Sequence, residues 1–263
     1  MNSPNEEWGI VLFATAGLRD FVENALRGIE RCGISPAFVH VVFPANAATE
    51  LAHLTQLFGA KPRVLEDLIE GADVSEFPST YVDYGTLEFN RVMRVRFRVI
   101  RAILKECKRV ISADVDVAWL RNPLPYLSEV TVLYPWACQT EAVASFPPTF
   151  CLGFFAVRAA PECLQLIDAH IARFTTQREH QNLTMQGLFN QIIRESPEYL
   201  PSIFPLPEAL FANGLLYSAI RVKDDAEPVA MVAQIQPFTF HSNFTIGIEN
   251  KRRLLQHVGG WLL

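Results

Sequence analysis

The chain has 263 residues, of which 50% are hydrophobic, and its 23 basic and 28 acidic side chains give a net charge of -5. A chain of this length and composition can bury roughly 70–75% of its unfolded surface, which is enough for one large core. We therefore expect a single domain over 1–263, and the slight acidic excess argues against a general nucleic-acid-binding protein.

The first residues predict neither a leader sequence nor a membrane anchor. The segment MNSPNEEWGIVLFATAGL has no basic region, and Thr15 and Gly17 interrupt its short apolar run. We expect a protein without a membrane span that resides in the cytoplasm. Its five cysteines show no C-x-x-C spacing and are predicted to be reduced structural thiols. Asn182 and Asn243 each begin an N-x-T triplet, which is a glycosylation signal only in secreted proteins.

Apolar runs alternate with helical periods in the first half of the chain. The pattern predicts strands over residues 8–16 and 36–44 and helices over 21–32 and 50–58. This alternation is typical of a Rossmann-type α/β fold, in which a mixed, mainly parallel sheet is flanked by helices. Ligands of such sheets bind at the carboxyl ends of the strands, and Ala14 and Thr15 follow the first strand at such an end.

The segment RVMRVRFRVIRAILKECKR, residues 91–109, predicts an amphipathic helix. Its basic side chains share one stripe, which indicates a solvated face rather than a nucleic-acid or lipid site; they are Arg91, Arg94, Arg98, Arg101, Lys105 and Lys108. Arg96 instead projects from the apolar face. A buried guanidinium requires an anion, so we expect its partner to be an inward carboxylate such as Asp114 or a ligand phosphate.

The segment VISADVDVAWL places Asp114 and Asp116 one residue apart inside an apolar run. An Asx-turn or a helix cap explains one such aspartate, but not two. Side chains at positions i and i+2 of a strand share a face, and carboxylates that close repel unless a positive group joins them. The pair therefore predicts a site for a cation or for a phosphate-bearing ligand.

The second half of the chain contains more proline and aromatic residues. CLGFFAVRAAP predicts a glycine-containing strand or a turn, and helices are predicted over residues 162–174 and 185–194. The last stretch, from residue 236 on, predicts a strand, a loop and a short basic helix. No repeat or linker separates the halves, so we expect them to share one core.

Three segments together resemble glycosyltransferase family 77 of the nucleotide-diphospho-sugar transferases. VISADVDVAWLRNPLPYL resembles the D-x-D segment of that family, CLGFFAVRAAP its N-x-G-F segment and HSNFTIGIENK its C-terminal H-x-N segment, with GGW beyond. The similarity spans nearly the whole chain, including Asn24 in the first helix. It implies a GT-A fold, a divalent cation that is usually Mn²⁺ (or Mg²⁺), and a nucleoside-diphosphate sugar donor, most often a UDP-sugar.

The resemblance also implies an arrangement of the two halves and of the metal site. Residues 1–120 would bind the nucleotide, and residues 121–263 would bind a glycan, glycoside or protein acceptor and supply a C-terminal metal and diphosphate segment. Asp116 would bind the metal directly, Asp114 would contact the ribose or a metal-bound water, and His241 would complete the metal site. Standing alone, His241 would be interpreted as a satisfied histidine at a strand end.

Further residues follow from the same resemblance. Thr15 and Ala14 would lie along the nucleoside, and Lys251 would reach the diphosphate from the segment that contains Asn243 and Gly247. Gln186 would lie near the reacting carbon of the sugar. The alternatives are a solvated basic helix face for Lys251 and a polar residue at a helix start for Gln186.

Two departures from the family pattern concern the sugar and acceptor side. Met185 stands where the family has an aspartate before the glutamine, and Cys151 stands where it has an asparagine.

The leading hypothesis is a metal-dependent retaining glycosyltransferase that moves a sugar from the donor to an acceptor hydroxyl. One alternative is a haloacid-dehalogenase-like phosphatase, which would use the D-x-D pair with VKDDAEP, residues 222–228, for magnesium. The other is a nucleotide-sugar-binding protein that has lost turnover.

Overall fold

The structure is a computed structural model, and it describes residues 6–15, 17–69, 80–142, 146–176, 183–216 and 234–263. Within these ranges a seven-stranded sheet has the strand order β3-β2-β1-β4-β7-β6-β8. Its strands are β1 (Glu6–Phe13), β2 (Val39–Phe43), β3 (Lys61–Val64), β4 (Cys107–Asp114), β6 (Trp136–Ala142), β7 (Thr149–Arg158) and β8 (Ile203–Pro205). Only β7 runs antiparallel to its neighbours. The mixed, mainly parallel sheet of the sequence analysis is confirmed.

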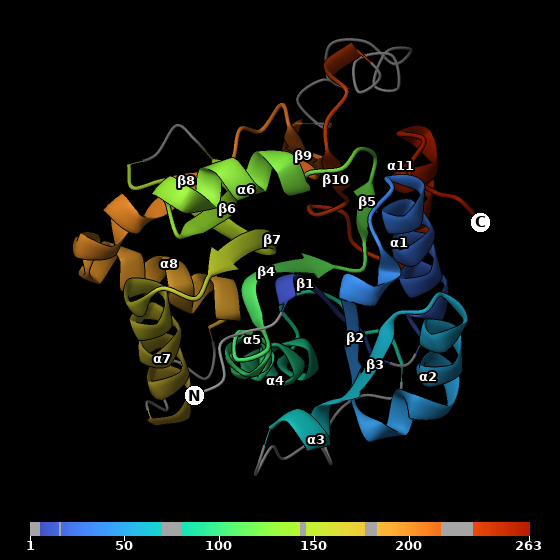
Figure 1. Cartoon of the computed structure of the whole chain (residues 1–263), viewed down its shortest axis with the longest axis horizontal. Helices are drawn as coiled ribbons and strands as arrows, with labels where there is room; N and C mark the ends of the chain where they lie inside the picture. The colour runs from blue at the N-terminus through green and yellow to red at the C-terminus, as the bar shows by residue number, and fades with distance from the viewer. Residues whose placement is uncertain (1–5, 16, 70–79, 143–145, 177–182, 217–233) are drawn as a thin grey trace.

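Helices cover both faces of this sheet (Figure 1). One apolar cluster joins one face to α1 (Arg19–Arg31), α2 (Ala48–Leu57), α6 (Leu124–Leu133) and α11 (Ile248–His257). A second joins the other face to α4 (Leu87–Arg94), α5 (Arg96–Ile103), α7 (Pro161–Thr176) and α8 (Met185–Glu195). Within β1, Ile10 and Leu12 belong to the first cluster and Val11 and Phe13 to the second, as the two-residue period of a strand requires.

A smaller three-stranded sheet lies beside the end of β4. It has the order β5-β10-β9, with β5 (Val117–Trp119), β9 (Phe211–Asn213) and β10 (Thr239–His241). Residues far apart in sequence therefore meet where the chain passes from the large sheet to the small one. The short elements are α3 (Leu65–Leu68) and the 3-10 turns η1 (Pro36–Phe38), η2 (Ala45–Ala47) and η4 (Pro197–Ser202).

The C-terminal segment is tied to α1 by the buried side chain of Asn24. Its amide nitrogen donates to the Gly260 carbonyl at 3.0 Å, and its oxygen accepts from the Leu262 N–H at 2.7 Å. These bonds satisfy a polar group that would be costly to bury alone, and they fix the end of α11 against α1.

The segment 91–109 corrects a prediction, because it is not one helix. Helix α4 ends at Arg94, α5 begins at Arg96, and Cys107 already belongs to β4. From Cys107 on, the chain pairs with β1, with Glu6 opposite Cys107, and this pairing outweighs the helical period of the sequence. Lys108 therefore lies on a strand, where its ammonium group bonds Glu7, and it is not part of the basic helix face.

Two smaller outcomes concern strand boundaries. Residues 36–38 form a 3-10 turn, since Pro36 has no N–H to donate to a sheet, and β2 starts at Val39. CLGFFAVR proves to be a strand, β7, with Gly153 inside it.

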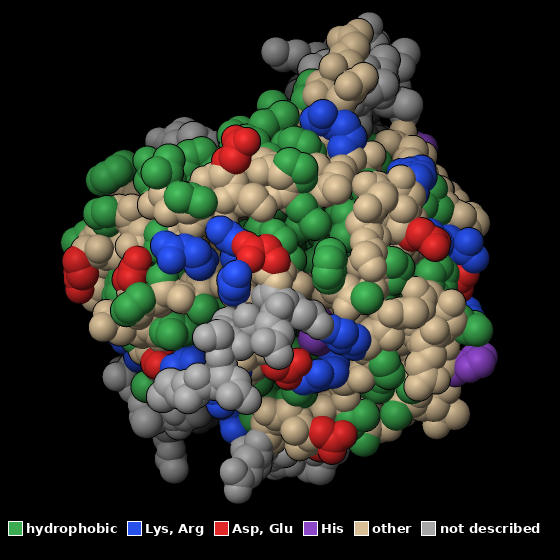
Figure 2. Space-filling model, viewed as in Figure 1, with side chains coloured by type: hydrophobic (Ala, Val, Ile, Leu, Met, Phe, Trp, Pro, Cys, Tyr) green, Lys and Arg blue, Asp and Glu red, His purple; other side chains and the backbone are tan. Residues whose placement is uncertain are grey.

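All five cysteines are free thiols, four of them buried. Among the helices of the described ranges, none combines the length and apolar character that a membrane crossing requires. On the face seen in Figure 2, basic side chains lie beside acidic ones.

Candidate active site

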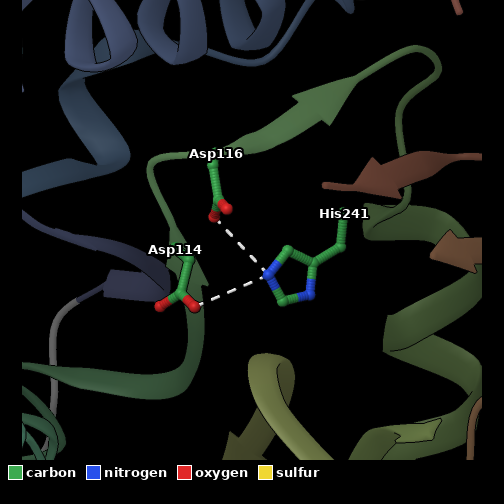
Figure 3. Close-up of side chains that lie close together, drawn as sticks. All are labelled: Asp114, Asp116 and His241. Atoms are coloured by element: carbon green, nitrogen blue, oxygen red, sulfur yellow. Dashed lines mark ion pairs between the residues drawn. The ribbon is translucent and has the colours of Figure 1, made fainter. Parts of the chain in front are cut away.

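The two aspartates do not share a strand, which corrects the prediction that they are strand positions i and i+2. Asp114 is the last residue of β4, whereas Asp116 lies in the turn before β5. Their carboxylates nevertheless approach the same imidazole because the turn brings Asp116 back toward the end of β4 (Figure 3).

His241, at the end of β10, completes this cluster. Its Nε2 lies 3.6 Å from an Asp114 oxygen and 3.5 Å from an Asp116 oxygen. One potential ligand atom from each of the three residues lies within 4.8 Å of the others. Two carboxylates and one imidazole form a donor set that suits Mn²⁺ or Mg²⁺ better than a thiolate-seeking metal. The structure thus brings together the three residues that the sequence analysis predicts for a metal site.

Neighbouring residues fix the orientation of the His241 ring. Its Nδ1 lies 3.1 Å from the Gln139 side-chain oxygen, an acceptor that requires a proton on Nδ1 and so directs Nε2 toward the carboxylates. A Cβ added to Gly153 would lie 2.0 Å from the ring, so only glycine fits there. The family-like glycine of β7 therefore makes room for the histidine.

Each carboxylate also has a basic partner within the chain. The Arg96 guanidinium, which is 2% exposed, donates to Asp114 at 2.6 Å and to the Ser112 hydroxyl at 2.9 Å. The Lys251 ammonium group, from α11, lies 2.5 Å from Asp116. Arg96 therefore forms an ion pair with Asp114. The sequence analysis named this carboxylate as one of two expected partners, the other being a ligand phosphate.

These charges control the protonation of the buried groups. Burial alone would raise the pKa of Asp116, but the charges of Lys251 and His241 outweigh it and hold this pKa well below its usual range. Burial alone would lower the pKa of His241, yet the Asp116 carboxylate raises it to about 10. Asp116 likewise raises the pKa of Lys251 against the effect of burial. Asp116 is thus ionised over the whole physiological pH range.

A cavity of about 420 Å³ opens beside this cluster. Its lining includes eight of the residues predicted for the site: Thr15, Arg96, Asp114, Asp116, Gln186, His241, Asn243 and Lys251. The side-chain oxygen of Asn243 is engaged within the chain, since it accepts from the Gly214 N–H at 2.8 Å. Ala14 is buried and is not among the lining residues, and its N–H pairs with the Val42 carbonyl. Gly247 is the N-cap residue just before α11 (Ile248–His257); it is not among the lining residues, and its N–H donates to Asp83.

The sequence analysis missed two polar residues of β6. Glu141 lines the cavity and accepts a 2.7 Å hydrogen bond from the Gln186 amide, whose oxygen accepts from the Leu152 N–H. Partial burial raises the pKa of Glu141. Gln139 orients His241, as described above. Gln139 and Glu141 stand two positions apart in WACQTEA, the spacing of one strand face, but one such pair near a strand end does not by itself indicate a site. Glu141 places a carboxylate next to Gln186, where Met185 offers none.

Comparison with known proteins identifies the family of the chain. The family described as nucleotide-diphospho-sugar transferase matches residues 61–255. The chain is 26% identical over 191 residues to the beta-arabinofuranosyltransferase RAY1 of Arabidopsis thaliana. The match covers 68% of this chain and 35% of that protein, so the chain spans about a third of its relative's length. The VKDDAEP segment of the phosphatase alternative lies outside the described residues.

Solved structures show the same architecture at low sequence identity. Mouse xyloside xylosyltransferase 1 has 15% identity and a TM-score of 0.55, covering 90% of this chain and 98% of its own. The galactosyltransferase LgtC, solved with donor and acceptor sugar analogs, has 12% identity and a TM-score of 0.62, covering 97% and 96%. The chain has the GT-A glycosyltransferase fold and belongs to the nucleotide-diphospho-sugar transferase family.

Proposed function

We propose that this protein is a cation-dependent glycosyltransferase that moves a sugar from a nucleoside-diphosphate sugar, with uridine as the nucleoside, to an acceptor hydroxyl with retention of configuration. The observation that carries the proposal is the cluster of Asp114, Asp116 and His241 at the edge of the cavity. Family membership supports the nucleotide-sugar donor.

The three clustered side chains would hold Mn²⁺ or Mg²⁺, since their donor atoms suit a hard divalent cation. A bound cation would supply positive charge against the negative charge that builds on the leaving diphosphate. The fixed His241 ring and the ionised Asp116 support this role. The Asp114 oxygen that is not bonded to Arg96 faces His241 and would serve the same cation or the ribose.

The remaining roles belong to side chains around the cavity. Lys251 and the Gly247 N–H, at the start of α11, would hold phosphate oxygens, because a helix N-terminus and an ammonium group both favour anions. The Arg96 Nη2 is buried without a hydrogen-bond partner within the described structure, and Arg96 lines the cavity. A buried donor of this kind supports a contact with the donor substrate. Thr15 would lie along the nucleoside.

On the sugar side, Gln186 and Glu141 form one hydrogen-bonded pair facing the cavity. Glu141 would accept a hydrogen bond from a sugar hydroxyl, a role that Met185 is unable to fill. We favour a same-face transfer in which the departing phosphate takes the proton of the acceptor hydroxyl. The acceptor would be a glycan, a glycoside or a glycosylated protein.

The test is a screen of nucleotide sugars for thermal stabilisation in the presence of Mn²⁺, since a ligand of the folded state alone raises the melting temperature. A UDP-sugar should give the largest shift, and incubation with it should then release UDP. Stabilisation without any UDP release, with or without acceptors, would favour the alternative of a nucleotide-sugar-binding protein. Stabilisation by no nucleotide sugar would reject the proposed donor.

A further inference from the structure

The start of α11 already holds an anion from the chain itself. The Gly247 N–H donates to an Asp83 carboxylate oxygen at 3.3 Å, between residues 164 positions apart in sequence. Gly247 has φ 87°, a conformation that favours glycine, and α11 begins at the next residue. A helix N-terminus favours anions because its first N–H groups lack helical partners and its dipole is positive there. In this structure the anion is Asp83.

A second group holds Asp83 in this position. The Tyr81 hydroxyl hydrogen-bonds the same carboxylate, and burial raises the pKa of Tyr81 to about 12, so this phenol keeps its proton. Tyr81 also lines the cavity, and it interacts electrostatically with Lys251 and Asp116. The Asp83 contact therefore lies beside the Lys251–Asp116 ion pair.

The other phosphate-binding group of α11 is occupied as well. Lys251, in the same helix, lies 2.5 Å from Asp116, and its side chain is 17% exposed. Both groups that would hold phosphate oxygens, the Gly247 N–H and the Lys251 ammonium, are thus bonded to carboxylates. One of those carboxylates, Asp116, is also a candidate cation ligand.

We propose that diphosphate binding is an anion exchange in which phosphate oxygens displace Asp83 from Gly247 and Asp116 from Lys251. This inference rests on the proposed function, because it concerns the regulation of the same site. Asp83 then moves toward solvent, and Asp116 turns its freed oxygen to the cation. Two consequences follow. Asp83 weakens donor binding, and cation and diphosphate bind cooperatively because each favours the state in which Lys251 has left Asp116.

Calorimetry on the parent and an Asp83→Asn variant tests the first consequence. UDP with Mn²⁺ should bind the variant about fivefold more tightly, the scale of one charge contact at a helix end. Glu88→Gln is the matched control, since Glu88 is exposed at the start of α4 in the same segment and its loss changes the net charge equally. Unchanged or weaker binding by Asp83→Asn, at an unchanged melting temperature, would show that Asp83 is structural and overturn the proposal.

Cation binding tests the second consequence. Mn²⁺ alone should bind the parent at least roughly tenfold more weakly than it does with UDP present. Lys251→Met, which removes the partner of Asp116, should bind Mn²⁺ alone more tightly than the parent does, and UDP less tightly. Equal Mn²⁺ affinity of the parent with and without UDP would contradict the exchange.

Binding of inorganic diphosphate, measured in the presence of a chelator, distinguishes a failure of this inference from a failure of the proposed UDP-sugar donor. Inorganic diphosphate should bind Asp83→Asn more tightly than the parent even if UDP binds neither protein, an outcome that would reject only the uridine donor. If Asp83→Asn does not fold, hydrogen exchange of the parent at residues 246–250 replaces it. Addition of inorganic diphosphate should change exchange at these amides, and no change there would overturn the exchange.

Discussion

At the residue scale, the buried Arg96 has both a structural ion pair and a proposed contact with the donor substrate. Its guanidinium holds Asp114 and Ser112 and stacks 5.8 Å from the Phe155 ring centroid, while Nη2 has no partner among the described residues. An arginine that served packing alone would be expected to have all its buried donors satisfied. Arg96 pairs with Asp114, and the free donor on the cavity wall supports the further role toward the donor substrate that we propose.

Substitution at Arg96 tests this double role. Arg96→Lys should fold and retain measurable UDP binding because the charge remains. Arg96→Met should keep most of the packing but lose at least about tenfold in UDP affinity, with a loss of roughly 1–3 kcal/mol of stability from the unpaired Asp114. Calorimetry with Mn²⁺ present and chemical denaturation measure the two effects. If Arg96→Met binds UDP as tightly as the parent, the role of Arg96 is structural.

The sequence analysis found charged residues in apolar surroundings, and it missed residues whose proposed roles depend on contacts with distant parts of the chain. Asp114, Asp116 and Arg96 are conspicuous in the sequence because a charged side chain in an apolar run is costly to bury without a partner. Asp83 and Glu141 are not, since polar residues in loops and at strand ends are ordinary. Their partners, Gly247 and Gln186, lie 164 and 45 positions away. No local pattern encodes such contacts.

At the scale of elements, the helices behind the sheet position the cavity wall. His170 of α7 is buried, and its Nε2 lies 2.9 Å from the Met185 carbonyl at the start of α8. A carbonyl only accepts, so Nε2 carries the proton. The His170 ring also packs 4.5 Å from the Phe97 ring of α5, measured between centroids. This histidine thus connects three helices and supports the residue before Gln186.

The same histidine predicts a pH dependence of stability. Burial lowers the pKa of His170 to about 4 from its ordinary 6.5, so protons favour the unfolded chain. The stability from neutral His170 is complete above pH 6.5 and is lost as the pH falls toward 4, by about 2 kcal/mol at pH 5. His170→Gln should reduce the difference in unfolding free energy between pH 7.5 and pH 5.

Denaturant unfolding at both pH values measures this effect. His53→Gln is the control, because His53 is exposed on α2 and its loss should leave the parental pH dependence unchanged. A His170→Gln variant with the full parental pH dependence would show that other groups cause it.

Elements with a clear period were predicted within a few residues, and those fixed by long-range pairing were not. Helices α1, α2, α7 and α8 begin within two residues of their predicted positions. The strand start at Cys107 and the division of residues 110–120 between two sheets depend on partners in β1 and β10. Pairing with distant strands decides where such segments begin and end, and a local period carries no information about it.

At the scale of the whole molecule, both halves of the chain build one sheet and one site. Asp114 comes from the first half, and His241 and Lys251 come from the last 25 residues, as the numbering of the chain shows. The family-like segments of the sequence converge at this point of the fold.

The stereochemistry of the product tests the proposed reaction. The D-x-D, glutamine and histidine segments resemble a retaining family, so an α-linked donor should give an α-linked product. The coupling constant of the anomeric proton, measured by NMR on the product formed with a UDP-sugar and an accepted glycoside, distinguishes the two outcomes. A β-linked product from an α-linked donor would reject the same-face mechanism.

The most direct test of the central claim is calorimetric titration with UDP, in Mn²⁺ and in chelator, for the parent and Asp116→Asn. The parent should bind UDP at least roughly 100-fold more tightly in Mn²⁺, and Asp116→Asn should lose that difference while remaining folded. His241→Ala should weaken UDP binding in Mn²⁺ by less, about tenfold, because two carboxylate ligands of the cation remain. Equal affinity of the parent in Mn²⁺ and in chelator would contradict the account of Asp114, Asp116 and His241 as a cation site.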